Sequence, residues 1–187
     1  MNSTSACKPS VRPLYAWEIT EARRVFADQL NYERVRVHEC AGWPNFINRL
    51  GMRLKGMDVS KAAPNAITLG DHCYFPVRLL ENPVPAGDSD HYKICWLMHE
   101  LTHAWQYQHM GWRYLAMALY AQMRYKGAAY QYGGEKGLLE SFKSGRLLNS
   151  FNLEQQGDIT RDYYQRLCVA GDVSAWLPYI HQIQRVA

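Results

Sequence analysis

Cysteine is scarce in this chain, and its spacing excludes two common classes of small protein. The 187 residues include five cysteines, at positions 7, 40, 73, 95 and 168, an odd number without any C-x-x-C pair. Disulfide-stapled domains and thiolate zinc modules depend on several closely spaced cysteines. The pattern therefore predicts neither class. It favours synthesis in a reducing cytosol and leaves open a single bridge formed after export.

Long apolar runs are also missing. No stretch approaches the roughly 18 consecutive apolar residues of a membrane-spanning helix. The first ten residues, MNSTSACKPS, lack the apolar segment of roughly 7–15 residues that secretory signal peptides carry. We therefore expect no membrane span, and we expect synthesis in the cytoplasm without a Sec signal.

The charge balance gives no sign of a nucleic-acid partner. The net charge is +4, and no long run of Lys or Arg accompanies it. Hydrophobic residues make up 48% of the chain and charged residues 20%, which is typical of a globular domain. The sequence has no internal repeats or low-complexity segments. We expect a flexible tail at residues 1–13 and a single domain at residues 14–187.

The most informative feature that is present is the sequence HELTH at residues 99–103. It matches H-E-x-x-H, in which two histidines four positions apart lie about 40° apart around a helix, one turn along. His99 and His103 can then each direct a ring nitrogen at one metal ion, with Glu100 beside them as a base. We predict a Zn²⁺ site with both histidines as ligands and Glu100 as the catalytic residue.

The motif lies within a helix predicted over residues 91–110. Ser89 and Asp90 are good N-cap residues, Gly111 is a good stop, and no Pro or Gly interrupts the segment. Apolar residues recur every three to five positions, which favours a helix packed into a core. The alternative is a pair of core histidines satisfied by hydrogen bonds, but burying two His and a Glu in one turn is costly without a metal.

Other residues of this helix are weaker ligand candidates. Cys95, one turn before His99, is more typical of a small buried hydrophobe. His91 and His109 project roughly 80° away from the metal-facing direction, and we expect them at the surface or at helix ends. The extended motif with a third histidine needs a Gly at position 106 to turn the chain. Gln106 stands there, so His109 is not favoured as a ligand.

A carboxylate from a later helix is therefore the expected third ligand. Residues 152–168 predict such a helix, with Asn152 as the N-cap. Glu154 falls in its first turn, and Asp158, one turn on, can accept the free N–H of a ligating histidine. Two alternatives stay open. In the first, Glu154 only complements the helix dipole. In the second, Glu140 or Asp158 is the ligand in its place.

The remaining segments predict a small sheet among helices. Residues 66–69 and 73–75 flank a Gly-Asp pair, which is the pattern of a hairpin, and residues 32–38 alternate as in a strand with one wet face. The other predicted elements are helices at residues 20–30, 43–50, 112–125 and 176–185, a loop at 82–88, and a mobile cleft wall at 128–136.

Three blocks of the sequence resemble the zincin metallopeptidase effector domains associated with type VI secretion VgrG and Rhs proteins. They are residues 66–76, 99–108 and 151–159, and the resemblance spans roughly residues 14–170. It implies an α+β fold: a single zincin-like domain, mostly helical, with a small sheet or hairpin bordering the active-site cleft. Gly157 and Asp158 depart from the Ala and the other acidic residue expected in this group.

Carried over to this chain, the resemblance implies zinc bound by His99, His103 and Glu154, with Glu100 as the base. It also implies use as an antibacterial or host-directed toxin. A secretion-spike carrier and a cognate immunity protein are then the expected partners. A contractile secretion system is the expected route to the periplasm of a target cell or to a host.

The predicted chemistry is hydrolysis of an amide bond in a protein or peptide. Zinc with three protein ligands lowers the pKa of a bound water to about 7, and Glu100 moves the proton from that water to the leaving amine. The oxyanion needs a second hydrogen-bond donor. Tyr130, Tyr132 and His181 are candidates, and the alternative for each is a side chain that only packs or lies at the surface. A cell-wall peptide substrate, a non-toxic processing peptidase and a catalytically silent zinc-binding module stay open as alternatives.

Overall fold

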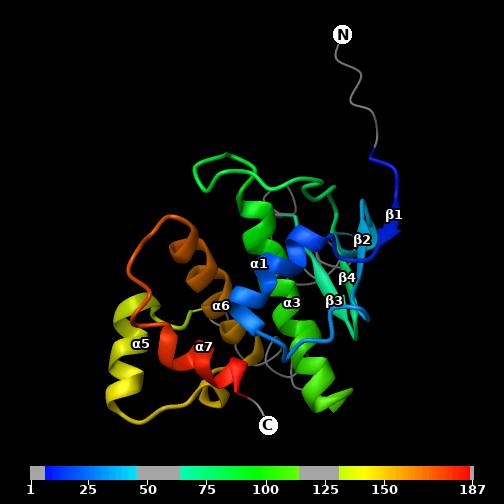
Figure 1. Cartoon of the computed structure of the whole chain (residues 1–187). Coiled ribbons are helices and arrows are strands. Elements are labelled where there is room, and N and C mark those ends of the chain that lie inside the picture. The colour runs from blue at the N-terminus through cyan, green and yellow to red at the C-terminus, as the bar shows by residue number, and fades with distance from the viewer. Residues whose placement is uncertain (1–6, 46–63, 114–130, 186–187) are drawn as a thin grey trace, which may run out of the picture.

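The computed structural model describes residues 7–45, 64–113 and 131–185 of the chain. These residues form an α+β domain, mostly helical with a small sheet, as the sequence predicts. Helix α3 (Tyr92–Met110) runs through the middle. The sheet lies on one side of it and three helices lie on the other (Figure 1): α5 (Gly134–Lys143), α6 (Leu153–Cys168) and α7 (Leu177–Gln184).

The sheet is mixed and has four short strands in the order β1-β2-β4-β3. Their bounds are β1 (Ser10–Arg12), β2 (Arg36–Glu39), β3 (Ile67–Leu69) and β4 (His72–Tyr74). β1 pairs antiparallel with β2, β2 pairs parallel with β4, and β4 returns antiparallel to β3. The last pair is the predicted hairpin, and it leaves β3 at an edge, in contact with α3.

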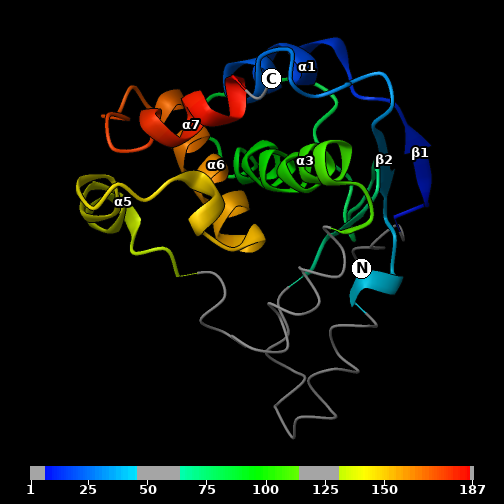
Figure 2. The ribbon, with the colours of Figure 1, turned by 90° about the horizontal axis from the view of Figure 1, so that it is seen from below.

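Helix α3 is enclosed on several sides. Helix α1 (Ala16–Phe26) also contacts α3, α6 and α7 (Figure 2). The fully buried apolar side chains include Val25 and Phe26 of α1, Val37 and Cys73 of the sheet, Leu97, Met98, Leu101 and Ala104 of α3, Ile159 of α6, and Tyr179, Ile180 and Ile183 of α7. Burial of this apolar surface on both sides excludes water from the middle of α3.

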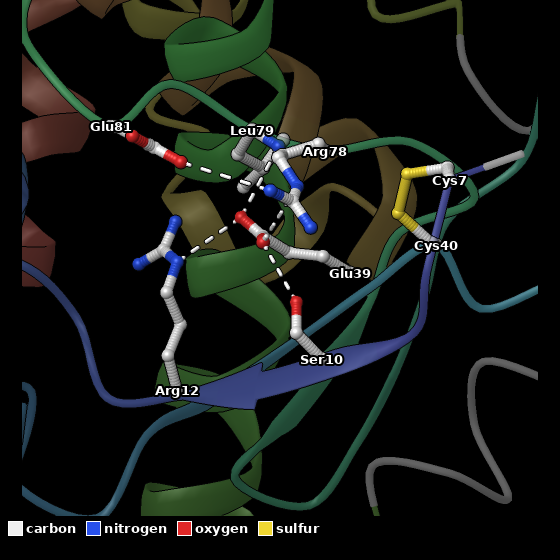
Figure 3. The surroundings of a disulfide bond; sticks show 8 residues. All are labelled: Cys7, Ser10, Arg12, Glu39, Cys40, Arg78, Leu79 and Glu81. Atoms are coloured by element: carbon white, nitrogen blue, oxygen red, sulfur yellow. Dashed lines mark hydrogen bonds and ion pairs between the residues drawn. A yellow bond between two sulfur atoms is a disulfide. The ribbon is translucent and has the colours of Figure 1, made fainter. Parts of the chain in front are cut away.

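The N-terminal segment is more ordered than the sequence predicts. The flexible tail predicted over residues 1–13 does not reach residue 13, because Ser10–Arg12 forms strand β1 at the second edge of the sheet. The single bridge that the sequence left open joins Cys7 to Cys40, beside this strand (Figure 3). The pattern of scattered cysteines gave no reason to choose this pair.

A buried ion-pair network holds the same segment. Arg12 donates two hydrogen bonds to Glu18, at 2.7 and 2.9 Å, and one to Glu39, at 3.1 Å (Figure 3 shows Arg12 and Glu39). Glu39 also accepts from the hydroxyl of Ser10 and from the backbone N–H of Leu79. One arginine therefore joins β1, α1 and β2, and this explains why a polar segment is part of the domain.

Most predicted elements are present with shifted ends. The helix predicted at 20–30 is α1, which begins and ends earlier. The strand predicted at 32–38 is β2, which begins four residues later and ends one residue later. The helices predicted at 91–110, 152–168 and 176–185 are confirmed as α3, α6 and α7. Helix α5 and the short 3-10 helix η3 (Leu148–Ser150) were not predicted.

Several predictions fall partly or wholly outside the described residues. These are residues 46–50 of the helix predicted at 43–50, nearly all of the helix predicted at 112–125, and residues 128–130 of the predicted cleft wall. The rest of that wall leads into α5, because residues 134–136 are its first turn. In the described ranges, no helix is long and apolar enough to cross a membrane.

Candidate metal centre

Two helices bring the predicted ligands together. α3 and α6 pack side by side (Figures 1 and 2). His99 and His103 lie on the face of α3 that meets α6, and Glu154 lies in the first turn of α6. Asn152 caps that turn, and its side chain accepts from the backbone N–H of Gln155. The side chain of Gln155 accepts in return from the backbone N–H of Asn152, which completes a capping box. The cap fixes where α6 begins and so where Glu154 is placed.

The three side chains converge on one buried point. Nε2 of His99 lies 3.2 Å from Nε2 of His103. Oε2 of Glu154 lies 3.4 Å from the first nitrogen and 3.6 Å from the second. All three residues are at most 7% exposed. One ligand atom from each lies within 4.8 Å of the others, so the group could hold a metal ion.

The donor set fits a zinc ion. Two imidazole nitrogens and one carboxylate oxygen are the ligands of one common type of catalytic zinc site. Among the described residues, the ion pairs of Glu154 involve only His99 and His103, so no Lys or Arg neutralises its buried carboxylate. An ionised carboxylate in such a place calls for a nearby positive charge, and a divalent cation would supply it.

The three groups shift one another's pKa. Burial opposes the charged form of each imidazole, but hydrogen bonds to Asp158 and Glu154 raise the pKa of His99 to about 10. The charge of Glu154 likewise raises the pKa of His103 against burial. Burial alone would raise the pKa of Glu154, yet the two imidazoles hold it well below its usual range. The group therefore favours a positive charge at its centre, which protons or a metal ion can supply.

Each histidine is bonded at its other ring nitrogen. Nδ1 of His99 lies 3.1 Å from Oδ1 of Asp158, the contact that the predicted role of Asp158 requires. Asp158 also accepts from Arg161 at 2.6 Å. Nδ1 of His103 lies 2.9 Å from Oε1 of Gln106, which the sequence marked only as a departure from the extended motif. Both contacts leave Nε2 as the nitrogen that faces the cluster.

Gly157 explains one departure from the family pattern. A Cβ built at this position would lie 2.7 Å from Cε1 and 2.8 Å from Nδ1 of His99. Since such contacts are shorter than van der Waals distance, an Ala would require the ring or the helix to move. Glycine therefore lets α6 approach the His99 ring closely, which spacing along the chain does not reveal.

Glu100 is buried beside the cluster and is held by the sheet. Oε2 of its carboxylate accepts from the hydroxyl of Thr68 at 2.7 Å, and the same hydroxyl lies 3.2 Å from the backbone oxygen of Glu100. Thr68 belongs to edge strand β3 and is itself buried. The sequence predicted the hairpin next to this helix but gave no role to Thr68.

The oxyanion candidates are not part of the cluster in the described residues. Tyr130 lies outside them. The hydroxyl of Tyr132 donates to Asp162 at 2.5 Å and accepts from the indole N–H of Trp176 at 3.3 Å. His181 lies on α7 with an exposed side chain. A catalytic role for any of the three stays a prediction.

The competing ligands lie elsewhere. Glu140 is exposed on α5 and pairs with Lys136. His109 bonds to the backbone oxygen of Trp105 in the last turn of α3, and His91 is the buried N-cap of the same helix. Cys95 is buried in the apolar core. None of them belongs to the His99, His103 and Glu154 group in the part of the chain that the structure describes.

The fold and the site thus define an α+β domain with a buried His-His-Glu group. Comparison with known proteins identifies what this domain is similar to. No protein-family model matches the chain. The chain is 32% identical over 171 residues to the type VI secretion system spike protein VgrG2b of Pseudomonas aeruginosa; the match covers 88% of the chain and 14% of that protein. The chain therefore spans only a small part of this relative.

A solved structure matches as well. The effector domain of Pseudomonas aeruginosa VgrG2b has a TM-score of 0.52 and 26% sequence identity, and the match covers 88% of this chain and 79% of that domain. The sequence and structure comparisons agree, so the chain is a homologue of the VgrG2b effector domain and shares its fold.

Proposed function

We propose that the chain is a zinc-dependent metallopeptidase that acts as a toxin effector of a type VI secretion system. The observation that carries the proposal is the buried convergence of His99, His103 and Glu154, with Glu100 next to the first ligand. A site that only stabilises the fold usually closes the fourth metal position with a protein ligand and has no need of a base.

In this proposal His99, His103 and Glu154 hold the metal. A bound zinc ion would lower the pKa of a water molecule and polarise the substrate carbonyl. Asp158 and Gln106 keep the two rings oriented through their Nδ1 atoms. The surrounding core keeps bulk water out, and this strengthens each of these electrostatic interactions.

Glu100 is the proposed proton carrier. Its carboxylate accepts a proton as water attacks the carbonyl and then delivers the proton to the leaving amine. The hydrogen bond from Thr68 holds the carboxylate in one orientation. Tyr130, Tyr132 or His181 would supply the second donor to the oxyanion. If the donor is Tyr132, its hydroxyl must first release its hydrogen bond to Asp162.

The homology to an effector domain supports delivery by secretion. Because the matched relative is named a spike protein, we propose carriage of this domain on a secretion spike to a target cell or host. A cognate immunity protein would then protect the producing cell. The substrate is proposed to be a protein or peptide, and a non-toxic processing peptidase or a silent zinc-binding module is the alternative.

Expression in bacteria tests the proposal. Wild type, Glu100→Ala and Glu140→Ala are each produced once in the cytoplasm and once with a periplasmic signal, and growth is followed. Glu140 is exposed on α5, so its variant is the control for loss of a carboxylate. We expect wild type and Glu140→Ala to stop growth in one compartment and Glu100→Ala to be harmless in both.

Other outcomes favour the alternatives. Equal toxicity of wild type and Glu100→Ala would contradict hydrolysis and favour a binding module. Harmlessness of every variant, together with cleavage of an unfolded protein substrate by purified wild type, would favour a processing peptidase. The compartment in which toxicity appears identifies where the substrate lies.

A further inference from the structure

Two buried glutamines lie behind the second histidine of the proposed metal site. Gln106 of α3 is fully buried, and Gln156 of α6 is 6% exposed. A glutamine side chain has one acceptor oxygen and one nitrogen with two hydrogens, so the partners of the nitrogen reveal how the amide is oriented. Here those partners include backbone oxygens, which can only accept.

The orientation of Gln156 follows from two such oxygens. Its Nε2 donates to the backbone oxygen of Phe151 at 2.9 Å and to that of Leu148 at 3.3 Å. Both hydrogens are therefore used, and Oε1 is left to accept. Oε1 lies 3.0 Å from Nε2 of Gln106, which is the donor in that contact.

The orientation of Gln106 follows in turn. Its Nε2 donates to Oε1 of Gln156 and to the backbone oxygen of Leu153 at 3.1 Å. Its remaining polar atom, Oε1, lies 2.9 Å from Nδ1 of His103. Since a carbonyl oxygen cannot donate, the hydrogen in this contact must belong to Nδ1.

We infer that Gln106 and Gln156 form a positioning relay that keeps a hydrogen on Nδ1 of His103 and so reserves Nε2 for the metal. The relay rests on the proposed metal site. It starts at the backbone oxygens that precede α6 and ends at a ligand on α3. The same bonds tie Leu153, directly before Glu154, to α3. The orientation of one ligand and the placement of another therefore depend on one chain of hydrogen bonds.

The two histidines are held by different chemistry. Asp158 holds His99 with a carboxylate that it shares with half-exposed Arg161. The relay holds His103 with neutral, buried amides. A buried network with every donor and acceptor paired is rigid, and loss of one member leaves the others unsatisfied. We therefore expect the orientation of the His103 ring to depend on this buried hydrogen-bond network.

Zinc affinity and imidazole nitrogen spectra of the full chain test the relay. The variants are Gln106→Leu, which removes the acceptor, and Gln106→Glu, which keeps an oxygen facing Nδ1. Gln108→Leu is the matched control, because Gln108 lies two positions on in the same helix and bonds to Asn31 and Asp71, away from the cluster. Affinity is measured by competition with a chromophoric chelator, without substrate.

We expect Gln106→Leu to bind zinc on the order of 10–100-fold more weakly, the range for loss of a partner that orients a ligand. Gln106→Glu keeps the acceptor for Nδ1 but loses both donor hydrogens, so it should recover only part of that loss, and Gln108→Leu should bind like wild type. In ¹⁵N-histidine spectra of the zinc-loaded wild type, His103 should bind through Nε2 and carry its hydrogen on Nδ1. This spectrum needs no variant, so it decides the point even if Gln106→Leu fails to fold.

Two results would overturn the relay. One is coordination of His103 through Nδ1, and the other is equal zinc affinity of Gln106→Leu and Gln108→Leu. Neither result would contradict the proposed function. The result that would contradict the proposed function, but not the relay, is a wild type that binds zinc as described and hydrolyses nothing. A wild type that takes up no zinc would overturn both proposals.

Discussion

Two buried clusters of charged residues within the described ranges differ in how their negative charge is balanced. In the N-terminal cluster Arg12 lies between Glu18 and Glu39, and all three side chains are at most 11% exposed. In the cluster between α3 and α6, Glu154 has only the imidazoles of His99 and His103 as ionic partners among the described residues.

The difference separates structure from function. The first cluster carries its own permanent cation, because a guanidinium keeps its charge at any physiological pH, and it needs nothing from outside. The second cluster has partners whose charge depends on bound protons, so a metal ion could supply the positive charge in their place. A buried carboxylate without a permanent cation is therefore a candidate for a cation-binding site.

Removal of the built-in cation is the most damaging change we expect. Arg12→Met leaves two buried carboxylates facing each other without a partner, and this should lower the free energy of unfolding by about 3–5 kcal/mol. Urea denaturation of the purified variant measures the loss. Arg78→Met is the control, since Arg78 is half-exposed and reaches the same Glu39 at 4.0 Å. It should lose less than about 1 kcal/mol, and equal losses would remove the distinction between the clusters.

Addition of a cation to the second cluster should have the opposite sign. Zinc at a thousand times its dissociation constant should stabilise wild type by about 4 kcal/mol, seen as a rise in Tm that a chelator reverses. Glu154→Gln removes the negative charge and should lose most of this rise, while Glu140→Gln on the surface should keep it. The same rise in wild type and Glu154→Gln would show that zinc binds elsewhere.

The Cys7–Cys40 bridge belongs to the first region alone. It joins residues 33 positions apart, and its loss should cost about 2–4 kcal/mol because the unfolded chain gains freedom. A reducing agent should therefore lower the stability of wild type and leave Cys7→Ser unchanged. Zinc affinity should stay the same in both forms. A drop in zinc affinity on reduction would mean that the two regions are coupled.

The smallest expected effect concerns the approach of α6 to His99. Gly157→Ala places a methyl group against the ring and should weaken zinc binding on the order of 10–100-fold, as for other changes that misplace a ligand. Alanine favours a helix over glycine by about 1 kcal/mol, so unfolding should not be the cause. Gly87→Ala, where a Cβ has no neighbour within 4 Å, is the control. Unchanged zinc affinity in Gly157→Ala would show that the His99 ring can move to make room for the methyl group.

Sequence reasoning reached the site mainly where the pattern is local. The HELTH segment placed both histidines and Glu100 on one helix, and the N-cap pattern at Asn152 placed Glu154 in the first turn of the next. The position of Glu154 next to the histidines is a tertiary contact, and the sequence supported it only through the expected ligand number and the family resemblance.

The residues that sequence reasoning missed make their contacts across elements. Thr68 reaches Glu100 from the sheet, and Gln156 reaches Gln106 from another helix. Neither contact leaves a periodic signal. Arg12 was assigned to a flexible tail because a three-residue strand is too short to show alternation and because its partner Glu39 is 27 residues away in the sequence.

The sequence by itself determined the helix that carries His99, Glu100 and His103, because helical geometry relates spacing along the chain to direction in space. It also determined the beginning of α6 and the hairpin of β3 and β4, since caps and turns depend on near neighbours. Only the tertiary structure decided that Glu154 meets His99 and His103, that Gly157 admits the ring, and that Arg12 neutralises two carboxylates. These are contacts between different helices and strands, and packing of the core, rather than local preference, selects them.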